Sequence, residues 1–175
     1  MNAAEHIVES YFRLCRGCFT FPDRKVVGGN NRQLDLLAYN LRDKKQFHVE
    51  VTVTHQLNWC EDRSYLPAEF DRKFFGVPPG RKSDGRRATD STRGKSYLKP
   101  INDTYLEVGF SPPAVNRIWV CWLVKGEAND RSIKVGHRPS VCNADFSIEV
   151  LSFRDLILPE LTEKVGTANY DDEVL

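Results

Sequence analysis

Apolar and polar positions alternate most regularly in residues 46–54. Every second residue there is apolar, and the apolar positions are Phe47, Val49, Val51 and Val53. His48, Glu50 and Thr52 therefore share the opposite face of a predicted strand. A second extended run covers residues 33–40, and the polar residues 41–45 separate the two runs. This pattern predicts a β-hairpin.

A helix is predicted over residues 3–16, where apolar residues recur at the helical period and Gly17 supplies a stop. Residues 67–75 are typical of a second helix, and a last helix follows a capping pattern that begins at Ser152. Strands are expected over residues 117–124 and 147–151. The first of these is apolar on both faces, so it should be central and covered on both sides. The expected fold class is α/β, with a mixed sheet flanked by helices.

The predicted hairpin places two carboxylates side by side. If the turn is centred between residues 42 and 43, Asp35 lies opposite Glu50 on the neighbouring strand. Like charges in this position repel each other, so something positive is expected to offset them. Two carboxylates, a backbone carbonyl and water suit Mg²⁺ or Mn²⁺. Glu5, at the rim of the first helix, could supply a third carboxylate. The alternative is two acids on a solvated sheet face.

These residues carry a resemblance to a known family. The order of Glu5 on a helix, Tyr11-Phe12, Gly17, a strand with Asp35 and a strand with Glu50 resembles the PD-(D/E)XK nuclease superfamily. It is most similar to the resolvase and restriction-endonuclease-like branches, and it covers roughly the first 55 to 75 residues. The resemblance implies a restriction-endonuclease-like sheet and a metal-dependent nuclease that acts on DNA, with RNA left open.

One position departs from the family pattern. The lysine that the resemblance implies two residues after Glu50 is replaced by Thr52. That lysine helps to position the attacking water and stabilises developing charge, and neither role demands one backbone position. Lys73, on the predicted helix over residues 67–75, is the candidate substitute, with Gln56 as a neutral alternative. Lys73 as a plain solvated lysine and Thr52 as an ordinary strand residue remain open.

The mechanism that the resemblance implies is metal-assisted hydrolysis of a phosphodiester bond. Asp35, Glu50 and the Val51 carbonyl would hold Mg²⁺ or Mn²⁺, and Glu5 would act through water or a second ion. A basic segment over residues 79–99 would contact phosphates without reading sequence. Its serines, threonines and glycines favour flexibility. The cations expected to bind nucleic acid are Arg81, Lys82, Arg86, Arg87, Arg93 and Lys95.

Length and composition fit one globular domain over all 175 residues, with 41% apolar and 28% charged residues. The net charge is only +1, so the distribution of charge is more informative than the total. Segment 79–99 holds seven basic residues against two aspartates, and the rest of the chain is acidic. No long apolar run predicts a membrane span. Five scattered cysteines favour free thiols and a cytoplasmic protein.

Other interpretations stay open at this stage. The chain could be a nucleic-acid-binding module that lost catalysis with the strand lysine, or an interaction protein whose basic segment binds an acidic partner. Cys15 and Cys18, with Cys60 and His55, could form a zinc site, although buried thiols are the simpler interpretation. Pro22-Asp23 is interpreted as a turn and not as the metal-binding dipeptide. Dimerisation, common among nucleases of this kind, is a further option.

Overall fold

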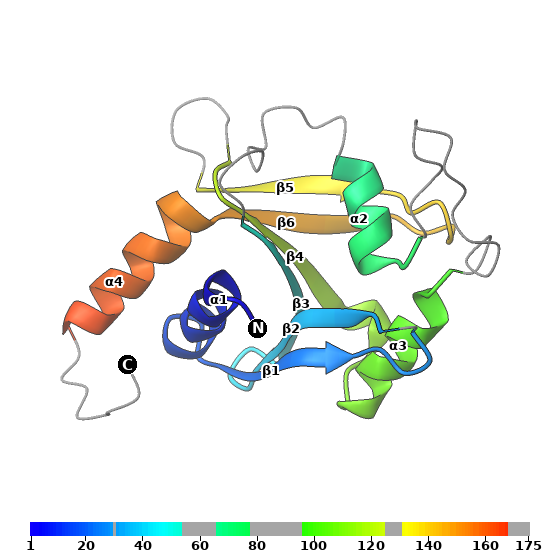
Figure 1. Cartoon of the computed structure of the whole chain (residues 1–175), viewed down its shortest axis with the longest axis horizontal. Helices are drawn as coiled ribbons and strands as arrows, with labels where there is room; N and C mark the ends of the chain where they lie inside the picture. The colour runs from blue at the N-terminus through cyan, green and yellow to red at the C-terminus, as the bar shows by residue number, and fades with distance from the viewer. Residues whose placement is uncertain (30, 54–65, 78–95, 125–130, 168–175) are drawn as a thin grey trace.

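Six strands form one mixed sheet at the centre of the molecule (Figure 1). The computed structural model describes residues 1–29, 31–53, 66–77, 96–124 and 131–167. The strands lie in the order β1-β2-β3-β4-β6-β5. Their bounds are β1 Cys18–Lys25, β2 Gln33–Asn40, β3 Lys45–Thr52, β4 Val115–Cys121, β5 Ser132–His137 and β6 Phe146–Ser152. The predicted α/β class with a mixed sheet flanked by helices is confirmed.

The predicted hairpin is confirmed together with its register. β2 and β3 are antiparallel, and Leu36 pairs with Val49 while Leu37 pairs with His48. Continuing this register by one step sets Asp35 opposite Glu50. β4 runs parallel to both β3 and β6, in the middle of the sheet. Its apolar residues pack on both faces, as its sequence predicts.

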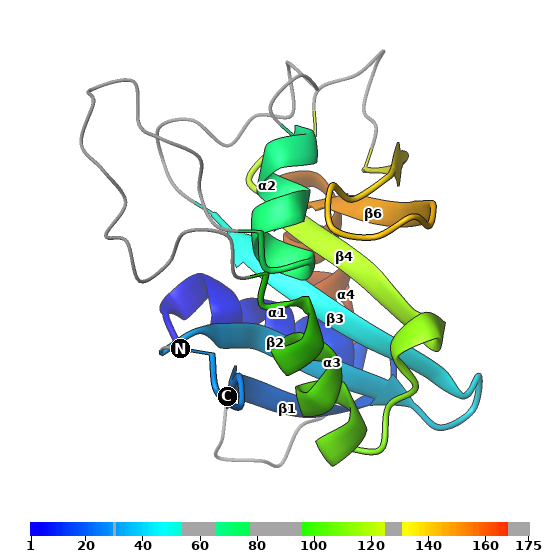
Figure 2. The same cartoon turned by 90° about the vertical axis from the view of Figure 1, so that its right-hand side faces the viewer.

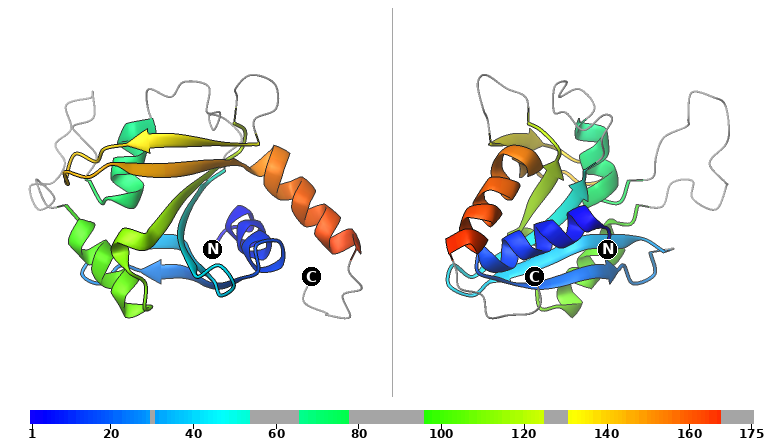
Figure 3. Two further views of the ribbon diagram at one scale, coloured as in Figure 1. Left: turned by 180° about the vertical axis from the view of Figure 1, so that it is seen from behind. Right: turned by 60° about the vertical axis from the view of Figure 1, so that its left-hand side comes forward.

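Helices α1 (Ala3–Leu14) and α4 (Leu158–Thr167) lie on one face of the sheet, as the right-hand view of Figure 3 shows. Gly17 follows α1 with a φ of 62°, a conformation that glycine adopts without steric cost. The short turn η3 (Phe153–Ile157) leads into α4 and is capped by the Ser152 side chain, which accepts a hydrogen bond from the Asp155 amide. The core on this face includes Val8, Phe12, Val49, Val51 and Ile118.

Helices α2 (Leu66–Phe74) and α3 (Leu98–Glu107) cover the opposite face (Figure 2). α2 packs over the centre of the sheet through Phe70 and Phe74, which are fully buried near Trp119. α3 packs over β2 through Ile101 and Tyr105. The short helix η2 (Pro112–Ala114) connects α3 to β4. Glu50 and His48 therefore lie on the face of β3 that α2 and α3 cover.

Two features differ from the sequence-based expectation. Pro22 and Asp23 lie within β1 and not in a turn; Asp23 has a φ of 49°, which bends the strand without ending it. The end of the basic segment 79–99 is helical, since Lys99 belongs to the first turn of α3 and forms an ion pair with Asp103 at 2.6 Å. Residues 79–95 lie outside the described residues.

Candidate active site

A lysine joins the two carboxylates that the hairpin brings together. The Lys73 Nζ lies 2.8 Å from Glu50 Oε2 and 3.8 Å from Asp35 Oδ2. The three side chains are mostly withdrawn from solvent, with exposed fractions of 21% for Lys73, 18% for Asp35 and 2% for Glu50. Lys73 comes from α2 and the carboxylates come from β2 and β3. The positive group expected beside the acid pair is therefore a side chain of the protein itself.

Lys73 does not neutralise both carboxylates. Burial, reinforced by the charge of Glu50, raises the pKa of Asp35 to about 7, against the opposing effects of Lys73 and the Val51 amide. Burial would also raise the pKa of Glu50, but the hydrogen bond from His48 and the charge of Lys73 outweigh burial and lower it. Near neutral pH the site therefore holds one firmly ionised carboxylate and a second that readily keeps a proton.

Two buried side chains, His48 and Tyr105, form a hydrogen-bonded chain that ends on Glu50. His48 Nε2 lies 2.8 Å from Glu50 Oε1, and His48 Nδ1 lies 2.7 Å from the Tyr105 hydroxyl. Burial lowers the pKa of His48, against the effect of Glu50, so the ring is neutral. Burial also raises the pKa of Tyr105, so its hydroxyl keeps its proton. Tyr105 then donates to His48, and His48 donates to Glu50.

Thr52, at the position of the missing strand lysine, takes part in packing. Its hydroxyl accepts a hydrogen bond of 3.0 Å from Trp119 Nε1 on the neighbouring strand β4. Trp119 is almost completely buried beneath α2. Thr52 therefore has a structural partner, while the only lysine in contact with the acid pair in the described part of the chain is Lys73.

The predicted contribution of Val51 is compatible with its backbone geometry. The Val51 amide donates a hydrogen bond of 2.8 Å to Asp35 Oδ2. Because the N–H and C=O of one strand residue point toward the same neighbouring strand, the Val51 carbonyl also faces β2. The Val51 peptide group thus lies beside the Asp35 carboxylate.

Glu5 is held at the start of α1 by contacts with the first residues of the chain. Its carboxylate accepts hydrogen bonds from the backbone and side chain of Asn2, which completes a capping box at the start of α1. Among the described contacts it meets Asn2 and the Met1 amine, at 3.9 Å, and neither Asp35 nor Glu50. Its charge still contributes to the raised pKa of Asp35. Glu5 acts on the site through its electric field and not by direct contact.

Helix α2 is held in place near Lys73 by polar contacts. The Arg32 guanidinium donates to the Arg72 carbonyl and, at 2.8 Å, to the Lys73 carbonyl. These carbonyls belong to the last turn of α2, where helix carbonyls lack partners within the helix. On the other side of α2, Asp71 accepts a hydrogen bond of 2.6 Å from the Ser140 hydroxyl and lies 2.8 Å from His137 Nε2. These contacts fix the backbone that carries Lys73.

Several predicted residues cannot be placed. Gln56, His55 and Cys60 lie outside the described residues, as do all six cations predicted to bind nucleic acid: Arg81, Lys82, Arg86, Arg87, Arg93 and Lys95. Cys15 and Cys18 are described, and their thiols contact the backbone carbonyls of Glu160 and Arg16. The described residues contain no group of three or more histidine, cysteine or acidic side chains arranged to hold a metal ion.

This chain was compared with protein-family models, curated proteins and solved structures. No family model, no curated protein and no solved structure matches this chain. Within the described residues, no helix has the length and apolar character needed to cross a membrane.

Three residues around the acid pair were not assigned to the site from the sequence, although His48 was placed on the strand face of Glu50. His48 shares a strand face with Glu50, and that two-residue spacing was a usable signal for the contact between them. Tyr105 belongs to a helix that the apolar pattern did not predict. Arg32 acts across 40 residues on the end of α2, and nothing in the local sequence indicates such a contact.

Proposed function

We propose that this protein is a metal-dependent nuclease that hydrolyses phosphodiester bonds of nucleic acid, with DNA as the expected substrate. The proposal is carried by one observation, the contact of Lys73 with both Glu50 and Asp35. The resemblance implies an Asp, a Glu and a Lys at one site. Here the lysine reaches the two acids from α2 instead of from the strand.

The residues present fit a magnesium or manganese ion. Mg²⁺ keeps several waters and is commonly bound by one or two carboxylates together with substrate phosphates, so a third protein carboxylate is not needed. Asp35 and Glu50 would hold the ion, with the Val51 carbonyl as a further oxygen. Burial and the charge of Glu50 raise the pKa of Asp35 in spite of Lys73, and a divalent cation bound there would favour the ionised carboxylate. When bound, the ion activates water and neutralises charge on the phosphate.

The protein's own groups would divide the remaining work. Burial would lower the pKa of Lys73, but the charges of Glu50 and Asp35 raise it overall. Lys73 is therefore a permanent cation, suited to holding an anionic phosphate oxygen and unsuited to removing a proton. The neutral His48 keeps Glu50 in one orientation. Expected catalytic residues are thus Asp35, Glu50 and Lys73, with His48 and Tyr105 as positioning residues.

The test is cleavage of single-stranded and duplex DNA and RNA with Mg²⁺ or Mn²⁺, by the native protein and by Glu50→Gln. Glutamine can still accept the hydrogen bond from His48, so the variant should fold. We expect native cleavage that EDTA abolishes and that falls at least about 100-fold in the variant. Glu107→Gln, on the exposed side of α3, is the matched control and should cut normally.

Other outcomes would select a different function. Salt-sensitive binding without cleavage by any of the three proteins would contradict the nuclease and favour a nucleic-acid-binding module. Neither binding nor cleavage would favour a protein partner. Cleavage that survives Glu50→Gln would mean that the chemistry takes place elsewhere in the chain.

A further inference from the structure

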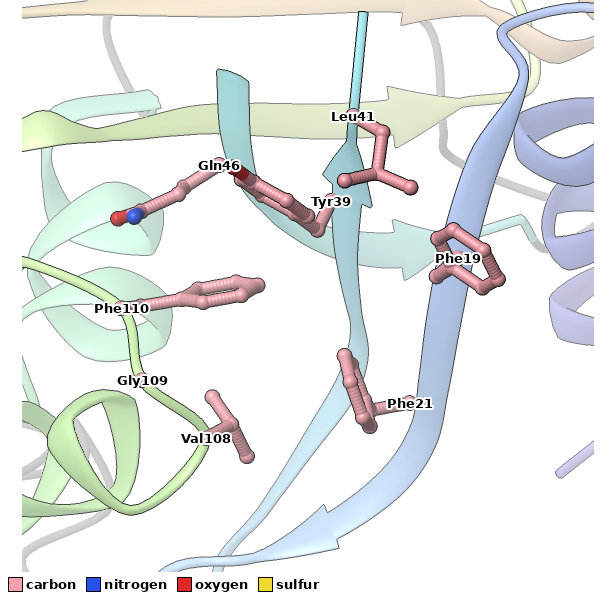
Figure 4. A pocket seen from close by; sticks show the side chains of 8 residues that line it. All are labelled: Phe19, Phe21, Tyr39, Leu41, Gln46, Val108, Gly109 and Phe110. Atoms are coloured by element: carbon pink, nitrogen blue, oxygen red, sulfur yellow. The ribbon is translucent and has the colours of Figure 1, made fainter. Parts of the chain in front are cut away.

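An aromatic groove opens between β1, β2 and the segment after α3 (Figure 4). Its Tyr39 lies four residues along β2 from Asp35, so the groove and the acid pair share a face of the sheet. The groove has a volume of about 480 Å³. Its lining includes Phe19 and Phe21 of β1, Tyr39 of β2, Phe110 after α3, Leu41 and Val108. Phe110 is part of the buried core and Tyr39 packs against it, whereas the rings of Phe19 and Phe21 are exposed.

The groove has a rigid floor and an open rim. Phe110 is 4% exposed, and its ring centroid lies 6.3 Å from Phe21 and 6.1 Å from Tyr39. Phe19 and Leu41 are 60% and 58% exposed on the rim. A contiguous apolar patch that is exposed to solvent often marks a binding groove. A flat apolar ligand could stack there without rearranging the floor.

A second hollow shares Phe19 and Leu41 with the groove and extends from there to the side of the sheet that carries α1 and α4, where Phe47 and Lys164 line it. Its charged lining residues are Arg16, Arg42, Lys45, Lys164 and a single acid, Asp43. A chain that stacks a ring in the groove and continues past Phe19 and Leu41 would bring its next anionic groups to a surface of net positive charge. Aromatic rings beside a cationic surface are the combination that binds single-stranded nucleic acid.

The outer edge of β1 is poorly suited to the main alternative, which is pairing with a strand of another protein. Pro22 has no N–H to donate, and Asp23 with its φ of 49° interrupts the extended backbone. Both features protect an edge strand from strand addition. The rings of Phe19 and Phe21, by contrast, stay accessible on the face of the sheet. The surface therefore favours a stacked ring over an added strand.

The groove is also within reach of the acid pair. Tyr39 lies four residues along β2 from Asp35 and points to the same face, a separation of about 13 Å along the strand. Phe21 pairs with Leu37, about 7 Å from Asp35 in the same direction. Leu37, which lies between Asp35 and Tyr39 on β2, is fully buried against Ile101 and Tyr105 of α3. A strand that joins the groove to the acid pair would therefore pass around α3.

We infer that this groove binds unpaired bases of single-stranded nucleic acid by stacking, next to phosphates held by the adjoining cations. The inference rests on the proposed function for its ligand class and narrows that function to substrates with an unpaired strand. Bases within a duplex are already stacked on one another, so their faces are not available to Phe19 and Phe21.

Binding in EDTA tests the groove without cleavage. The probes are fluorescent oligothymidine and oligouridine of about 12 nucleotides, which separate DNA from RNA, and a matched duplex. Phe19→Ala should weaken binding of the better single strand at least about fivefold. Phe19→Leu should weaken it similarly, whereas Phe19→Trp should bind like the native protein. Leu106→Ala, which removes an equally exposed apolar side chain of α3 (59% exposed), is the control.

Each result supports or overturns the inference. Native-like binding by Phe19→Ala or by Phe19→Leu would overturn the inference. It would also be overturned if sedimentation showed the native protein to be an oligomer that Phe19→Ala dissociates, because the groove would then be an interface between copies of the chain. If the native protein does not cleave nucleic acid but the Phe19 variants bind single strands as predicted, the nuclease proposal is wrong and the inference about the groove is confirmed. If cleavage depends on Glu50 while all Phe19 variants bind single strands like the native protein, the inference about the groove is wrong and the nuclease proposal is supported.

Discussion

Lys73 compensates the repulsion between two carboxylates that the backbone register forces together. Asp35 and Glu50 occupy opposite positions on adjacent strands, where like charges destabilise a sheet. The ammonium group at 2.8 Å from Glu50 offsets part of that cost, and protonation of Asp35, whose pKa is raised to about 7, offsets more of it near neutral pH. The sequence predicted the pair, and the family resemblance made Lys73 a candidate for the missing cation, with Gln56 as the alternative. The predicted role of Glu5, through water or a second ion, stays a prediction; its carboxylate is engaged by Asn2 and the Met1 amine.

Asp35→Asn should stabilise the metal-free protein in a pH-dependent way. The pKa of Asp35 rises from 3.8 to about 7 on folding, so its ionised form opposes folding. That cost is absent below about pH 4, grows up to about pH 7 and then stays constant. The variant should gain up to about 4 kcal/mol over the native protein above pH 7. Urea unfolding in EDTA at about pH 4 and about pH 8 measures this, and an equal difference at both would contradict it.

Thr52→Lys should cost stability and keep activity. The substitution removes the hydroxyl that accepts from Trp119 Nε1, a loss of about 1–3 kcal/mol. The new ammonium group lies on the same strand face as Glu50, so metal-dependent cleavage should be preserved or raised at temperatures where the variant is folded. Thermal unfolding and initial cleavage rates check both parts. A folded but inactive variant would show that position 52 is not equivalent to the strand-lysine position.

At the scale of elements, the hairpin was predictable because its period-two pattern is local. Helix α3 was not, although Leu98, Ile101 and Tyr105 follow a helical spacing, because Pro100 in the same stretch resembles a helix breaker. The structure places Pro100 in the first turn of α3, where a missing N–H costs nothing. β5 is short, contains Gly136 and lies at the edge of the sheet, so its alternation of apolar and polar residues is a weak signal for a strand.

The connection after α2 contains a glycine that the fold requires. Gly76 has a φ of 65°, and a Cβ there would lie 2.6 Å from the Tyr97 Cβ and 2.8 Å from its backbone. Gly76→Ala should destabilise the protein by more than about 2 kcal/mol and lower cleavage by displacing Lys73. Gly17→Ala has the same backbone cost, with a φ of 62°, but meets nothing within 4 Å. Equal losses in chemical denaturation of the two variants would refute this account of Gly76.

At the scale of the whole molecule, charge is separated along the chain. The basic segment 79–99 carries about +5 in a protein of net charge +1, which leaves the remainder acidic. A local sequence pattern does not indicate where this segment lies relative to the acid pair. Residues 79–95 also lie outside the described residues. The predicted contact of this segment with phosphates depends on charge alone. Its contribution can therefore be measured from the salt dependence of nucleic-acid binding.

Replacing Arg86 and Arg87 by serine should weaken nucleic-acid binding and flatten its dependence on salt. Each lost phosphate contact lowers the slope of log affinity against log salt by about 0.7 to 0.9. Arg13→Ser, on the exposed side of α1, is the control and should leave the slope unchanged. Fluorescence anisotropy over a salt series measures it. An unchanged slope in the double variant would exclude these two arginines from phosphate contact.

The central claim is that Lys73 supplies from α2 the cation that the nuclease pattern implies on the strand. The decisive measurement is the Mn²⁺-dependent cleavage rate of native protein, Lys73→Ala, and Lys73→Ala combined with Thr52→Lys. The single variant should lose at least about 100-fold in rate, and the combined variant should regain much of it because its lysine approaches the same carboxylates from β3. Near-native cleavage by Lys73→Ala would contradict the account.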